Sequence, residues 1–175
     1  PALALAQINS EILFMLKEAD KNVDDSYLCF CEGSVRFEKN IKKREEEINS
    51  LNRKVTSYTA ALARQSLNDD ESALLPELMH ISHDIERIGD LSINIFELAQ
   101  KRTEEQISLS DSAIRELTEI NDLLQKQFDQ VKLALEHADR TAANNAVALE
   151  EDLNQMHRKL TANHMKRLEG GQGSP

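Results

Sequence analysis

Residues 80–97 read HISHDIERIGDLSINIFE, and apolar side chains recur in this stretch every three or four positions. This spacing is typical of a long helix that buries one face. The buried stripe is predicted to comprise Leu78, Ile81, Ile85, Ile88, Ser92, Ile95 and Ala99. Asn68 followed by Glu71 has the spacing of a capping box at the start of this helix. Pro76 is expected either to kink the helix or to mark its first turn.

The same periodicity continues on both sides of this stretch. It predicts four further helices, over residues 8–30, 41–66, 114–135 and 147–165, the last with Asp139 as a cap. The polar connections between such long helices are short, so neighbouring helices run antiparallel. The fold class is therefore all-α, an elongated antiparallel helical bundle.

The composition excludes several classes of protein. The 175 residues include only 5 Gly and 3 Pro, too few turn formers for a β-sandwich or an α/β fold. The net charge of −10 repels phosphate backbones, which argues against nucleic acid as a partner. No stretch reaches the ~18 apolar residues of a membrane span, and Cys29 and Cys31 are expected to be reduced thiols. Pro1 is not an initiating residue, so we expect the chain to be a piece of a longer protein.

An internal repeat divides the chain. The segment EEEINSLNRKVT (45–56) aligns with EEDLNQMHRKLT (150–161) with six identities in twelve positions, at an offset of 105. Residues 1–103 are therefore predicted to form a three-helix repeat, and residues 104–168 the first two helices of an incomplete second repeat, followed by a flexible tail over 169–175. The unpaired apolar seam of the second repeat predicts a homodimer or a contact with a segment outside this chain. The alternative is that long helices resemble one another by composition alone.

The central stretch also carries an unusual arrangement of charge. Glu86 and Asp90 lie four residues apart on one helix face, where like charges repel unless a cation offsets them. Arg87 is one candidate for that cation. The other is a hard metal ion, iron or another divalent or trivalent metal, because such ions prefer carboxylate oxygens, and His83 and Asn94 lie on the same stripe. Gly89 is best explained by the close approach of another helix.

These residues resemble the "ERIGD…NI" signature of the PhoU family, whose domains are repeated three-helix bundles. The resemblance implies that Glu86 and Asp90 are metal-cluster ligands. The family has a second carboxylate pair on the preceding helix, after an "IN-x-L" step that is present here as residues 48–51. This chain has Asn52 and Thr56 at the positions of that pair, and Glu45 and Asn49 lie on the same stripe.

The ends of the chain, PALALAQINSEILFM (1–15) and NHMKRLEGG (163–171), resemble the cytoplasmic PhoU-like region of bacterial Na/Pi cotransporter-family proteins. The resemblance implies a regulatory, non-enzymatic domain at the cytoplasmic face of the cell membrane, in contact with its own transmembrane region or a second copy. It implies no catalytic residues. The alternatives are a stand-alone PhoU-like phosphate-signalling regulator and a di-metal helical-bundle enzyme. A di-metal site of that kind uses two Glu-x-x-His motifs, and Glu77 with His80 supplies one of them.

Overall fold

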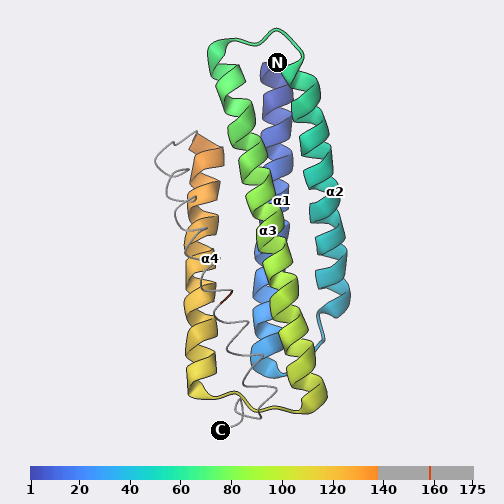
Figure 1. The fold of residues 1–175 in the computed structure, drawn as a ribbon, viewed down its shortest axis with the longest axis vertical. Coiled ribbons are helices and arrows are strands. Elements are labelled where there is room, and N and C mark those ends of the chain that lie inside the picture. Colours follow the sequence, from blue (N-terminus) through green and yellow to red (C-terminus); the bar gives the residue numbers. More distant parts are fainter. Residues whose placement is uncertain (138–157, 159–175) are drawn as a thin grey trace.

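The computed structural model describes residues 1–137 and Arg158. The described part of the chain contains four helices, which are α1 (Ala2–Glu32), α2 (Glu38–Ala63), α3 (Asp69–Glu105) and α4 (Asp111–His137). Consecutive helices run antiparallel, and α1 packs against all three others (Figure 1). The predicted all-α helical bundle is confirmed. The predicted fifth helix and its cap Asp139 lie outside the described residues, and the boundaries of the two repeats remain a prediction.

The core of the bundle lies where α1, α2 and α3 meet. Ile12, Ile48 and Ile85 supply one central side chain from each helix, and none of the three is exposed to solvent. Burying a side chain of this size contributes about 1.5–3 kcal/mol to folding. The predicted stripe of α3 is buried from Leu78 to Ala99, apart from Ile81, which is only partly buried. Hydrophobic periodicity therefore sets which face of each helix points inward.

The start of α3 confirms the predicted capping box. The side chain of Asn68 accepts a hydrogen bond from the backbone N–H of Glu71 at 2.8 Å, and the Glu71 carboxylate accepts one from the N–H of Asn68 at 3.0 Å. The expectation that Pro76 marks the first turn is wrong, because the helix begins at Asp69 and continues through Pro76. Pro76 is exposed, so water can solvate the backbone carbonyl that its missing N–H leaves without a helical partner.

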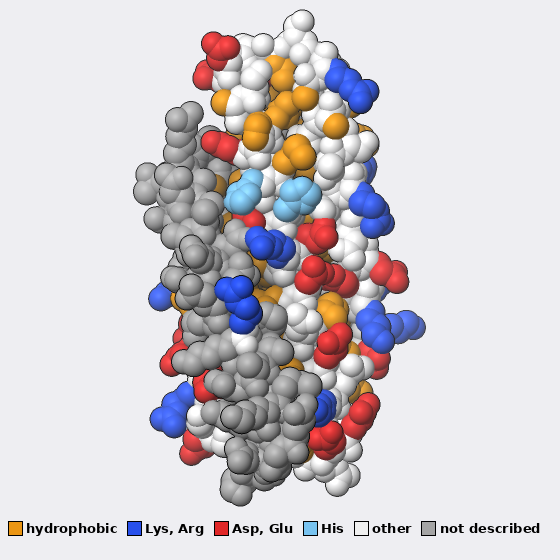
Figure 2. Space-filling view, in the orientation of Figure 1, with side chains coloured by type: hydrophobic (Ala, Val, Ile, Leu, Met, Phe, Trp, Pro, Cys, Tyr) orange, Lys and Arg blue, Asp and Glu red, His pale blue; other side chains and the backbone are white. Residues whose placement is uncertain are grey.

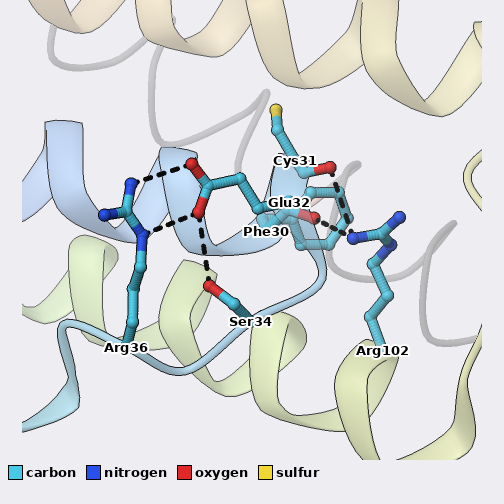
Figure 3. Close-up of polar contacts among 6 residues, drawn as sticks. All are labelled: Phe30, Cys31, Glu32, Ser34, Arg36 and Arg102. Atoms are coloured by element: carbon cyan, nitrogen blue, oxygen red, sulfur yellow. Dashed lines mark hydrogen bonds and ion pairs between the residues drawn. The ribbon is translucent and has the colours of Figure 1, made fainter.

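The end of α1 is held by a residue of α3 (Figure 3). Gly33 ends the helix in the left-handed conformation, with φ 67°. Arg102 donates hydrogen bonds from Nη1 to the carbonyl oxygens of Phe30 at 2.9 Å and Cys31 at 3.3 Å. A Cβ at position 33 would lie 2.2 Å from that same nitrogen. Glycine is therefore required here both for its backbone conformation and for the approach of Arg102.

Candidate functional site

A stripe of polar side chains runs along the contact between α2 and α3. We call it the polar seam; it comprises Glu45, Asn49 and Asn52 of α2 and Ser82, Glu86, Asp90 and Asn94 of α3. On each helix the members are three or four residues apart and therefore share one face. The space-filling view shows acidic side chains gathered along the α2–α3 face, below the histidine side chains (Figure 2).

One half of the polar seam is a chain of hydrogen bonds between the two helices. Asn52 is 7% exposed, and its side-chain amide donates from Nδ2 to Oε2 of Glu86. The other end of the same amide, Oδ1, accepts a hydrogen bond from Oγ of Ser82 at 2.7 Å. Ser82 is fully buried. The buried polar groups of Asn52 and Ser82 therefore find their partners inside the protein, as most buried polar groups do.

The other half of the polar seam holds a carboxylate, that of Glu45, with one oxygen atom that lacks such a partner. Oε2 of Glu45 is buried and makes no hydrogen bond to any described residue. It lies against Gly89, where an added Cβ would be only 2.8 Å away. Burial raises the pKa of Glu45 from 4.5 to about 8, and a hydrogen bond with Asp90 and the charges of Asp90 and Glu86 add to this shift. Burial and the neighbouring carboxylates therefore favour the protonated form of Glu45.

An open cavity of about 450 Å³ gives solvent access to this second half. It is lined by Lys42, Glu45, Glu46, Asp90, Ile93 and Asn94. Lys42, which supplies the positive charge of this lining, forms an ion pair with Glu38 at 2.8 Å. The polar side chains of this lining are three acidic groups, one amide and one lysine that is already paired, a set that favours cations over anions.

The structure brings together most of the residues that the sequence singled out. Glu45 lies close to both Glu86 and Asp90, and Gly89 allows the close approach of α2 that its presence predicted. His83 is exposed and Asn94 lines the cavity. Sequence reasoning missed Ser82, although it lies four residues before Glu86 on the same stripe.

The Glu-x-x-His half-motif lies outside the bundle core. Glu77 is exposed, and the side chain of His80 is 53% exposed and contacts the buried carboxylate of Asp84 at 3.3 Å. Di-metal bundles instead direct these ligands into the core from several helices. The geometry of this pair therefore gives no support to a di-metal enzyme.

The residues of the polar seam do not fit a multinuclear metal cluster. Within residues 1–137, no three His, Cys, Asp or Glu side chains are arranged to hold a metal ion. At the positions of the second carboxylate pair, Asn52 bonds to Glu86 and the Thr56 hydroxyl donates to the carbonyl of Asn52 at 2.8 Å. A role for Glu86 and Asp90 as ligands of a single metal ion remains a prediction.

Comparison with known proteins finds a distant relative that is named for phosphate export. The chain is 22% identical over 169 residues to YjbB of Salmonella typhimurium strain LT2, a protein whose name describes inorganic phosphate export. The alignment covers 96% of this chain but only 31% of the length of YjbB. No solved structure gives a significant match. Among the helices of residues 1–137, none contains an apolar run of the length that a membrane span requires.

The family model named PhoU domain matches residues 12–99. The matched segment begins in α1, includes all of α2 and ends near the last turns of α3, so it covers most of the three-helix bundle and contains the whole polar seam. The chain therefore belongs to the PhoU domain family.

Proposed function

We propose that this chain is the regulatory domain of a phosphate-transporting membrane protein of the Na/Pi cotransporter type, and that it modulates phosphate movement by protein–protein contact at the cytoplasmic face of the membrane. The observation that carries the proposal is the alignment with YjbB. Almost the whole chain aligns with 31% of a protein named for phosphate export, which leaves most of that protein for other functions.

The charge of the chain favours regulation by contact over direct binding of phosphate. The net charge is −10, and the cavity of the polar seam is lined by the acidic side chains of Glu45, Glu46 and Asp90 and by one lysine that is already paired with Glu38. A phosphate ion entering this cavity would be repelled. The domain therefore receives the phosphate signal through a protein partner, which we propose to be the transmembrane region of the same protein together with a second copy of this domain.

The first test is to read the gene on both sides of the segment that encodes this chain. The proposal predicts several apolar runs of about 20 residues in the same reading frame. The transmembrane part and this chain, expressed together as two separately tagged polypeptides, should then co-purify from detergent-solubilised membranes. A reading frame without apolar runs would overturn the transporter context and would leave a stand-alone PhoU-like regulator.

A further inference from the structure

We propose that a protein amide takes the place of a metal ion opposite Glu86. In this inference the hydrogen-bond chain Ser82–Asn52–Glu86 stabilises the Glu86 carboxylate from within the protein, so that this half of the polar seam forms without a cation. The inference concerns only the contact between α2 and α3. It holds whether or not the chain is attached to a transporter, so its failure and the failure of the proposed function are distinguishable.

The orientation of the Asn52 amide follows from its two neighbours. An ionised carboxylate only accepts hydrogen bonds, so the NH₂ end of the amide must face Glu86. The carbonyl end then faces Ser82, whose hydroxyl donates to it at 2.7 Å. Both neighbours favour the same orientation, and the amide, at 7% exposure, is shielded from competing water. A hydrogen bond to a charged acceptor in such a setting is among the stronger ones in proteins.

This orientation is the opposite of what a metal ion requires. A hard cation binds oxygen, but the oxygen of Asn52 is directed to Ser82, and its NH₂ group presents hydrogens to Glu86. Thr56, at the other position of the implied carboxylate pair, directs its hydroxyl to the backbone of its own helix. The two α2 residues therefore supply neither the charge nor the oxygen atoms that a cluster bridging α2 and α3 needs.

The decisive variant is Asn52→Asp, which exchanges the amide for a carboxylate of the same shape. We expect Asn52→Asp to lower the melting temperature in EDTA, because the introduced carboxylate would face Glu86. We expect added MnCl₂, a probe for hard-cation sites, to raise it again, by about 5–10 °C at a hundredfold excess over the dissociation constant. Ser57→Asp is the matched control, because it adds the same charge to α2 at an exposed position. The melting temperature of this control should not respond to MnCl₂.

The unmodified protein provides a second test that does not depend on the folding of the variant. The inference predicts that its melting temperature is the same in EDTA and in MnCl₂, and that Glu86→Gln leaves this result unchanged. A stoichiometric metal in the purified protein that is lost in Glu86→Gln would overturn the inference. A response of the unmodified protein to MnCl₂ that matches that of Asn52→Asp and disappears in Glu86→Gln would overturn it as well.

Discussion

Replacing Glu45 by glutamine should remove a pH dependence from the stability of this protein. In the folded state burial, together with Asp90 and Glu86, raises the pKa of Glu45 to about 8, whereas its ordinary value is 4.5. The folded protein therefore binds one more proton than the unfolded chain between these two pH values. Stability from this group is fully present below pH 4.5 and is lost as the pH rises to about 8.

The size of the effect follows from this window. A fully insulated carboxyl group would lose about 1.4 kcal/mol of folding free energy per pH unit across it. Glu45 is only partly buried and faces an open cavity, so solvent screening reduces the total to about 2 kcal/mol. Glutamine has the shape of the protonated acid and cannot ionise. Glu45→Gln should therefore match the unmodified protein near pH 5 and be about 2 kcal/mol more stable at pH 8 and above.

Urea unfolding followed by circular dichroism at 222 nm, in steps from pH 5 to pH 9, measures this difference. At the alkaline end we expect the midpoint of Glu45→Gln to lie about 1 M higher in urea. Glu46→Gln is the matched control, since Glu46 is the next residue and is exposed. If the stabilities of Glu45→Gln and the unmodified protein stay parallel over the whole range, the assignment of the buried proton to Glu45 is wrong.

Four further substitutions test other contacts by the same urea assay. Gly33→Ala should cost about 2 kcal/mol, because alanine is strained at φ 67° and its Cβ would displace the guanidinium of Arg102. Arg102→Ala should cost about 1–3 kcal/mol of unfolding free energy, since two carbonyls at the end of α1 lose their donor. In the double variant this loss should not add fully to that of Gly33→Ala, and full additivity would contradict the shared contact. Asp90→Asn should flatten the pH dependence that Glu45 produces, because it removes a neighbouring negative charge, and an unchanged profile would argue against their contact. Ile48→Ala, at a fully buried position, should cost about 2–5 kcal/mol, and a loss below about 1 kcal/mol would refute its place in the core.

The fold was predictable from the sequence because its main determinant is local. Apolar spacing of three and four residues gives the buried face of each helix, and the capping box of Asn68 and Glu71 gives the start of α3. The position of Pro76 inside α3 was not predictable from the proline alone. The capping box at Asn68 determines where the helix starts, despite the proline further along. The exposure of Pro76 to solvent lowers the cost of the hydrogen bond that its backbone cannot make.

The candidate site was predictable only in part. Helical spacing places Glu86 and Asp90 on one face of α3, and Gly89 indicates that another helix packs closely against that face. Neither the spacing nor the glycine identifies which side chain of the other helix lies there. The contact of Glu45 with this face and the direction of the Asn52 amide depend on how α2 is rotated against α3. Arg102 caps a helix that ends about 70 residues earlier in the chain, and no local spacing contains that information.

The most direct test of the central claim is a measurement of phosphate movement in the native host. Uptake and release of radiolabelled phosphate would be compared between cells with the intact gene and cells whose gene lacks the codons for this chain, after a shift from phosphate-poor to phosphate-rich medium. Our account predicts that phosphate movement persists without the chain but no longer responds to the shift. An unchanged response to the shift would contradict the regulatory role proposed for this domain.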